Sequence, residues 1–174
     1  MRANASSGSP GRTYRFLETA GAAGCADCAS WPFGFGGSYT TFALAWAAPP
    51  PSTVVAGDET MYELAVTNTG AVTGDVVVTC YSSFGGDGGA TVPSAPAAAP
   101  QAAAVKRPPL RSLFAFDRVE ELRPGATAAL AFALAPAGRT LVAEDGRQVA
   151  SAGAWKVVCE AGGLVSVDAA LAVV

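Results

Sequence analysis

The sequence predicts an all-β protein, a β-sandwich of immunoglobulin-like shape with about seven strands. From residue 39 onward, apolar and polar side chains alternate in short runs, which is the period of a half-buried strand. Turn signals separate these runs, at Asn68-Thr69-Gly70, Arg123-Pro124-Gly125 and Asp145-Gly146. No stretch shows the period of an amphipathic helix. Many short strands joined by such turns are typical of a sandwich.

The first half of the sandwich contains three expected strands, at residues 39–46, 60–67 and 76–83. The first places Phe42, Leu44 and Trp46 on one face, and Pro49-Pro50-Pro51 then ends it, since proline cannot donate to a sheet. The second alternates Tyr62, Leu64 and Val66 with residues that face the other way. The third places Val78 and Cys80 on one face.

The second half contains four more expected strands, at residues 111–122, 127–134, 154–159 and 164–173. Larger apolar side chains alternate with alanines in the second of these, and Trp155, Val157 and Cys159 share one face of the third. Leu141-Val142 leads into the turn Glu144-Asp145-Gly146-Arg147, which predicts a hairpin.

The chain divides into an irregular lead and a patterned domain. Residues 1–37 show no sustained period, and residues 38–174 carry the strands. Residues 84–109 interrupt the pattern with glycines, prolines and an alanine run. We expect this insertion to be mobile, since a loop of such length without a pattern is unusual inside a compact domain.

Composition excludes several classes of function. Eleven basic and 14 acidic residues give a net charge of −3, and the basic residues are scattered, so a nucleic-acid partner is not expected. No apolar run is long enough to span a membrane. The first residues do not form a signal peptide, which leaves the compartment unknown. The chain has no histidine, which excludes Ser-His-Asp and Cys-His catalytic arrangements.

Four cysteines leave no convincing metal site. Cys25-x-x-Cys28 has no second pair after it, and a structural zinc ion needs four ligands. A local disulfide or two idle thiols is expected there. Cys80 and Cys159 are expected to be two small buried apolar residues. A disulfide between them requires adjacent strands with Cα atoms closer than roughly 7 Å.

Further residues are candidates for chemistry. The acidic pairs Glu120-Glu121 and Glu144-Asp145 are expected to be solvated surface pairs. Trp31 and Phe33 either stack against a sugar or pack as structural anchors, and the anchor role is preferred. Gly34 and Gly36 precede no helix and therefore make no phosphate loop.

An ordered set of segments resembles a known family. The segments are Gly11-Arg12-Thr13-Tyr14-Arg15-Phe16, Pro32-Phe33-Gly34-Phe35-Gly36, Ser38-Tyr39-Thr40-Thr41-Phe42, Val66-Thr67-Asn68-Thr69-Gly70, Leu113-Phe114-Ala115-Phe116-Asp117-Arg118-Val119, Leu122-Arg123-Pro124-Gly125 and Gly153-Ala154-Trp155-Lys156-Val157. Their order over residues 9–163 resembles the junction and C-terminal fibronectin type III-like domain of family 3 glycoside hydrolases. The first segment is most similar to the β-xylosidase branch, ahead of the β-glucosidases.

The resemblance implies a non-catalytic accessory domain of such a hydrolase, preceded by a remnant of the second α/β domain. In the family, the nucleophilic aspartate comes from the first domain and the acid/base from the second, and neither region is in this chain. We therefore expect no catalytic residue, cofactor or metal in the chain, and no activity from it alone. The parent is expected to act on β-xylosides or β-glucosides and to be secreted, with this chain a truncated gene product or a detached module.

The resemblance also implies a role for the lead. Its residues are expected to anchor the junction to the catalytic α/β domains in cis: Arg12, Tyr14, Arg15, Trp31, Phe33, Phe35, Tyr39 and Phe42. An oligosaccharide is a further candidate partner. A stand-alone module that binds carbohydrate or protein is the alternative function. Gly37, Ala126 and Ala154 depart from the residues usual in the family, which suggests a drifted copy.

Overall fold

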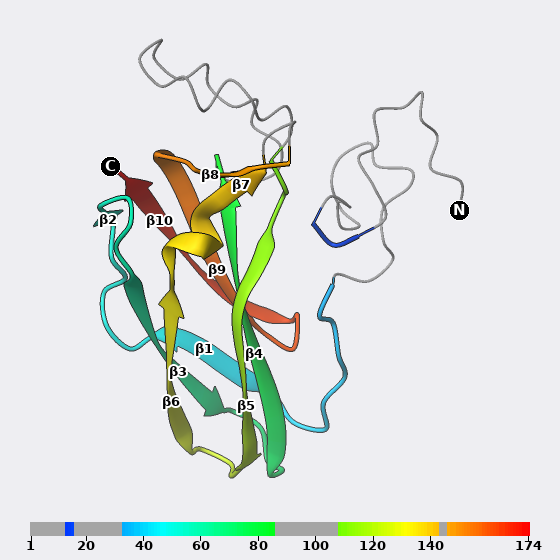
Figure 1. Ribbon diagram of the computed structural model, residues 1–174. Helices are drawn as coiled ribbons and strands as arrows, with labels where there is room; N and C mark the ends of the chain where they lie inside the picture. Colours follow the sequence, from blue (N-terminus) through cyan, green and yellow to red (C-terminus); the bar gives the residue numbers. More distant parts are fainter. Residues whose placement is uncertain (1–12, 16–32, 86–107, 143–145) are drawn as a thin grey trace, which may run out of the picture.

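The computed structural model describes residues 13–15, 33–85, 108–142 and 146–174, which form a sandwich of β-sheets (Figure 1). The longer strands are β1 (Phe42–Trp46), β3 (Thr60–Asn68), β4 (Gly74–Phe84), β5 (Ser112–Leu122), β6 (Thr127–Leu134), β9 (Gly153–Ala161) and β10 (Val165–Val173). The short elements are β2 (Thr53–Val54), β7 (Thr140–Val142), β8 (Gln148–Ala150) and the 3₁₀ turn η2 (Pro136–Arg139). The all-β sandwich is confirmed, and its longer strands are those that the alternation predicts.

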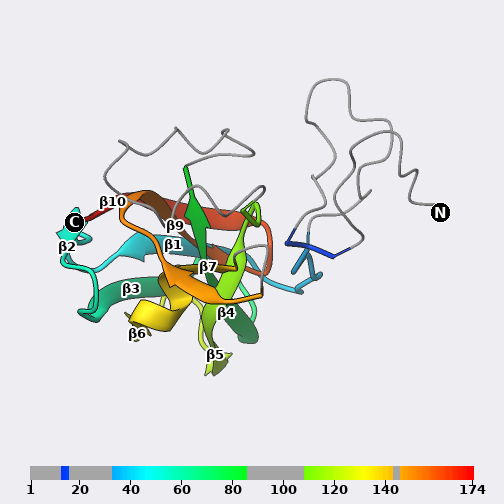
Figure 2. The same cartoon turned by 45° about the horizontal axis from the view of Figure 1, so that its top comes forward.

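Two sheets face each other across the core. The first has the order β1-β3-β6, and the second has the order β2-β10-β9-β4-β5. A two-stranded ribbon of β7 and β8 lies at one end, where the sequence predicts a hairpin. The chain crosses from the first sheet to the second between β3 and β4 and returns between β5 and β6, as in an immunoglobulin-like sandwich (Figure 2).

The alternation in sequence becomes alternation of burial. In β3 every second side chain points into the core, and Tyr62, Leu64 and Val66 have no exposed surface. Its partner β6 runs antiparallel, with Tyr62 opposite Phe132 and Leu64 opposite Leu130. Burial of these side chains contributes roughly 1.5–3 kcal/mol for each one removed from water. The inner faces of the two sheets therefore supply the main stabilising term.

Two elements have no counterpart in the sequence prediction. Strand β2 has two residues and follows the proline run, and it pairs in parallel with the end of β10. The turn η2 packs close to β4 and β5, where the hydroxyl of Ser82 donates a 2.7 Å hydrogen bond to the carbonyl of Gly138. Both elements are held by contacts with residues distant in the chain, so no local sequence pattern predicts them.

Cys80 and Cys159 form a disulfide, so the expectation of two separate buried thiols is wrong. They lie directly opposite each other on the adjacent strands β4 and β9, with Cα atoms 4.1 Å apart and sulfur atoms 2.05 Å apart. Both residues are fully buried, as expected. The spacing condition for a disulfide is met, but the pairing of β4 with β9 joins residues separated by 79 positions and cannot be seen from either strand alone.

The structure describes one of the two predicted acidic pairs. Glu120 and Glu121 are both exposed at the end of β5, as expected for a surface pair. Glu121 adopts a φ of 51°, so the strand is irregular here, and its backbone N–H turns toward Asp75. Residues 144 and 145, most of the insertion (86–107) and the cysteines at 25 and 28 lie outside the described residues.

Candidate functional site

In the structure β1 begins at Phe42, so from here on the lead comprises all residues before β1, of which 13–15 and 33–41 are described. These residues contact the five-stranded sheet on the side of β4 and β5. We call this contact the lead-docking site. Its centre is aromatic: the ring of Tyr14 stacks on Phe33 with centroids 4.3 Å apart and planes at 19°. Tyr14 also meets the ring of Tyr81 edge-on, with centroids 6.0 Å apart. Such pairs contribute about 0.5–1.5 kcal/mol beyond the area that they bury.

Hydrogen bonds join the first part of the lead to β5 and the residues just before it. The N–H of Leu113 donates to the hydroxyl of Tyr14 at 3.2 Å, and the N–H of Leu110 donates to the carbonyl of Arg15 at 2.6 Å. The guanidinium of Arg15 donates to Ser112 at 3.1 Å. Because β5 is the edge strand of its sheet, the N–H of Leu113 has no further strand to pair with, and the hydroxyl of Tyr14 takes the place of that partner.

Tyr81 is the platform beneath the aromatic pair. It is 1% exposed, and the guanidinium of Arg111 lies 4.7 Å from the centre of its ring. The same guanidinium forms a 3.0 Å ion pair with Glu160 on β9. Burial raises the pKa of the Tyr81 hydroxyl, so the phenol is neutral at ordinary pH. Tyr81 therefore contacts the lead on one side, and Arg111 on its ring connects the start of β5 to β9 through Glu160.

The second part of the lead lies against the turn between β9 and β10. The N–H of Gly36 donates to the carbonyl of Gly162 at 3.1 Å. A Cβ at Gly163 would come within 2.8 Å of the backbone of Phe35, and Gly163 has a φ of 68°. Both the close approach and the left-handed backbone favour glycine here.

Asn68 fixes the last part of the lead as it enters β1. Its side-chain oxygen accepts hydrogen bonds from the hydroxyl of Thr40 at 2.7 Å and from the N–H of Gly70 at 3.0 Å. Its amide nitrogen donates to the carbonyls of Val72 and Leu122, both at 2.8 Å. Asn68 has no exposed surface, and all of its side-chain hydrogen-bonding positions are used. One buried amide thus joins the lead, a turn and the end of β5.

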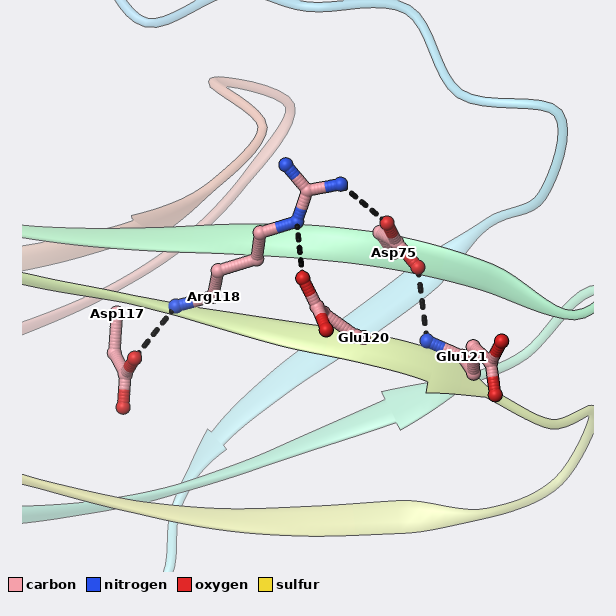
Figure 3. A network of polar contacts seen from close by, with 5 residues as sticks. All are labelled: Asp75, Asp117, Arg118, Glu120 and Glu121. Carbon is pink, nitrogen blue, oxygen red and sulfur yellow. Dashed lines mark hydrogen bonds and ion pairs between the residues drawn. The ribbon is translucent and has the colours of Figure 1, made fainter.

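A cavity of about 530 Å³ lies between the lead and the sandwich. Glycines, Ser38, Thr40, Phe42 and the apolar residues Val76, Val77 and Leu164 line most of it, and Asp75 and Arg118 supply its charges. Figure 3 shows these charges in a network in which Arg118 forms ion pairs with Asp75 and Glu120. Nε of Arg118 lies 3.6 Å from Oε1 of Glu120.

Arg118 is the one basic residue of this network, which also contains four acidic residues, so the network carries net negative charge. The backbone N–H of Glu121 donates to Asp75 at 2.8 Å, and this bond, followed by that of Arg118, lowers the pKa of the Asp75 carboxyl. The N–H of Arg118 donates to Asp117 at 2.8 Å. A carboxylate held ionised by donors is suited to fixing the chain, and a general acid requires the opposite shift.

The predicted anchor residues fall into three groups. Tyr14 and Arg15 contact β4 or β5, the backbone of Phe35 lies against the β9–β10 turn, and Phe33 stacks on Tyr14. Phe33 and Phe35 remain 47% and 37% exposed. Tyr39 is fully exposed, and Phe42 is half-buried against the core. Arg12 and Trp31 lie outside the described residues.

The residues that receive the lead were missed by sequence reasoning. Tyr81 and Arg111 look like ordinary residues of predicted strands, and Asn68 stands in the sequence only as part of a turn signal. The one signal available is the strength of that turn, since Asn at such a position often bonds nearby backbone groups. Thr40 gives no indication of its bond to Asn68.

The described part of the chain offers little for other chemistry. No group of three or more potential metal-ligating side chains occurs among the residues described. Within the same residues, no helix is long and apolar enough to cross a membrane.

Comparisons with known proteins show that the chain is similar in sequence to part of two fungal xylosidases. No protein-family model matches the chain. The chain is 31% identical over 162 residues to the exo-1,4-beta-xylosidase of Emericella nidulans, a match that covers 87% of this chain and 18% of that protein. It is 26% identical over 171 residues to a probable exo-1,4-beta-xylosidase of Neosartorya fischeri, and this match covers 90% of this chain and 19% of that protein. The chain thus spans less than a fifth of these relatives.

Solved structures share the fold. A beta-glucosidase from Listeria innocua matches 83% of this chain and 17% of its own with a TM-score of 0.66 and 20% identity. Beta-glucosidase 3B from Thermotoga neapolitana matches 82% of this chain over 17% of its own, with a TM-score of 0.60 and 20% identity. The fold, together with the partial match to much longer hydrolases, is that of a fibronectin type III-like accessory domain. The chain corresponds to the C-terminal accessory domain of family 3 glycoside hydrolases.

Proposed function

We propose that the domain holds the catalytic α/β domains of a family 3 glycoside hydrolase in place through its lead-docking site. The supporting observation is that the lead, which precedes the sandwich in the chain, is fixed to it at three separate points. These are the Tyr14–Phe33 stack, the Gly36–Gly162 hydrogen bond and the Thr40–Asn68 hydrogen bond. A segment fixed in this way sets the direction from which a preceding domain joins.

The surface that remains on the lead has the character of a domain contact. Phe33, Phe35 and Tyr39 keep 47%, 37% and 100% of their surfaces exposed. Aromatic side chains are enriched where one protein surface packs on another. Residues 1–37 would then belong to the preceding domain and linker, and residues 38–174 to the accessory domain.

The parent enzyme would cleave β-xylosides or β-glucosides, since the relatives named above are xylosidases and the matching structures are glucosidases. Its catalytic carboxylates would come from its other domains. The isolated chain should release no nitrophenol from aryl β-xylosides or β-glucosides. Turnover by a preparation free of host hydrolases would contradict the non-catalytic role.

A chimera tests the structural role. The matching segment of the Emericella nidulans xylosidase is replaced by this chain, and the activity and thermal stability of the chimera are compared with those of an enzyme that lacks the segment. We expect the chimera to recover both properties. Equal instability of the two proteins would overturn the proposal.

Oligosaccharide contact is a finer proposal that rests on the same exposed aromatic rings. Stacking of Phe33 or Phe35 on a sugar would give saturable heat on titration with xylo-oligosaccharides, and Phe35→Ala would weaken it. If titration of the full chain with xylo-oligosaccharides gives no heat of binding, the proposal of oligosaccharide contact is contradicted.

A further inference from the structure

A second cluster of polar groups lies inside the sandwich, away from the lead. Arg139 ends η2 and is 3% exposed. Its Nη2 donates to the carbonyl of Asp58, while Nε and Nη1 have no hydrogen-bond partner. The hydroxyl groups of Tyr62 and Thr60 are also buried without a partner. Among the described ion pairs, none includes Arg139.

The chain brings these three side chains to one place. Thr60 and Tyr62 are two positions apart on β3, so both point to the same inner face. Arg139 bonds the carbonyl of Asp58, two residues before Thr60, and its charge acts on the hydroxyl of Tyr62. Figure 1 shows η2 directly after β6, which is the partner of β3 in the same sheet.

None of the described acidic residues pairs with this charge. Tyr62 packs between aromatic rings, with centroids 5.8 Å from Trp46 and 6.4 Å from Phe114. A buried guanidinium without a counter-charge and a buried hydroxyl without a partner both lose the hydration that they have in the unfolded chain. A group that accepts hydrogen bonds and carries negative charge would offset both losses.

We propose that Arg139, Tyr62 and Thr60 form a buried binding site for one small monovalent anion of the halide class. All three side chains can donate N–H or O–H groups, which suits an acceptor without donors of its own. A single positive charge matches a single negative one. Water would satisfy the hydroxyl groups but would leave the guanidinium without a counter-charge.

Thermal unfolding of the full chain tests the site, with sodium chloride exchanged for sodium gluconate at constant ionic strength. Gluconate is too large for a buried site of this kind. The melting temperature should rise with chloride along a single-site saturation curve, because a ligand that binds only the folded state stabilises it. Arg139→Met should abolish this dependence, and the exposed Arg123→Met should retain it. A chloride response equal in wild type and Arg139→Met would overturn the proposal.

Two further measurements do not depend on the folding of the arginine variant. Tyr62→Phe keeps the ring and removes one donor, so the half-saturating chloride concentration should rise roughly tenfold. Crystals grown in bromide should show an anomalous peak within hydrogen-bond reach of Arg139 Nε or Nη1. An unchanged half-saturating concentration, or only water at Arg139 in such crystals, would contradict the site.

Discussion

The hydroxyl of Thr40 donates a 2.7 Å hydrogen bond to the side-chain oxygen of Asn68, a residue with no exposed surface. Thr40 belongs to the lead and Asn68 to the end of β3, and 28 positions separate them. Since the same amide also bonds Gly70, Val72 and Leu122, the end of the lead is part of the cooperative core of the sandwich.

Asn68→Ala should lower the free energy of unfolding by about 2–4 kcal/mol, because it leaves several buried backbone groups without partners. Urea unfolding measures this change. Ser166→Ala, at an exposed strand position, is the control and should change stability by less than about 0.5 kcal/mol. Equal effects of the two substitutions would show that Asn68 has no special role.

Gly163→Ala should displace the lead from the β9–β10 turn, because the new Cβ would lie 2.8 Å from the backbone of Phe35. Gly146→Ala is a matched control: Gly146 also has a positive φ, of 84°, but nothing lies within 4 Å of the place that its new methyl group would take. Amide hydrogen exchange at Gly36 should accelerate about tenfold or more in the first variant only, which corresponds to about 1.4 kcal/mol of local opening. Equal exchange in the two variants would mean that the close approach does not hold the lead.

Replacement of Cys80 and Cys159 by alanine should destabilise the chain by about 4 kcal/mol, the entropic estimate for a closed loop of this length. Reductant should lower the melting temperature of the wild type and leave that of the double variant unchanged. If reductant lowers the melting temperature of both proteins equally, the stabilising disulfide is not the one between Cys80 and Cys159.

Alkaline pH should destabilise the domain through Tyr62. Burial raises the pKa of this phenol to about 12 in the folded chain, against a smaller opposing effect of Arg139. In the unfolded chain the phenol has a pKa of about 10, so the unfolded state binds fewer protons between about pH 10 and 12. Stability due to this group is therefore complete below about pH 10 and falls as pH rises toward about 12, by up to about 1.4 kcal/mol per unit.

Tyr62→Phe separates this contribution from those of other tyrosines. Tyr81 also has a raised pKa, so the wild type and the variant should both lose stability, but the wild type should lose it more steeply. Chemical unfolding at several pH values measures the two slopes. Identical slopes would contradict the buried, neutral state of Tyr62.

Local sequence was sufficient to predict the strands that bury one face. β3 and β6 alternate cleanly, and their turns carry asparagine, proline and glycine, so local information determines both. β2 escapes prediction because two residues carry no period. The disulfide could not be predicted because it depends on β4 and β9 being neighbours, which is a property of the topology.

Of the candidate site, the residues of the lead could be predicted from the sequence, and the residues of the sandwich that receive the lead could not. The aromatic residues of the lead stand out in an irregular, glycine-rich segment, and Tyr14 and Phe33 are identifiable there. Their receiving surface is not, because Tyr81 and Arg111 have the residue types expected of any strand near a sheet edge. Only the spatial arrangement shows that the ring of Tyr81 faces the lead.

The thermal half-life of the xylosidase chimera tests the structural role of the lead-docking site most directly. Tyr14→Ala with Phe33→Ala removes the aromatic stack while leaving the strands of the sandwich intact. We predict that the double variant inactivates several times faster than the chimera at elevated temperature, with kcat at low temperature unchanged. A half-life equal to that of the unsubstituted chimera would contradict the account.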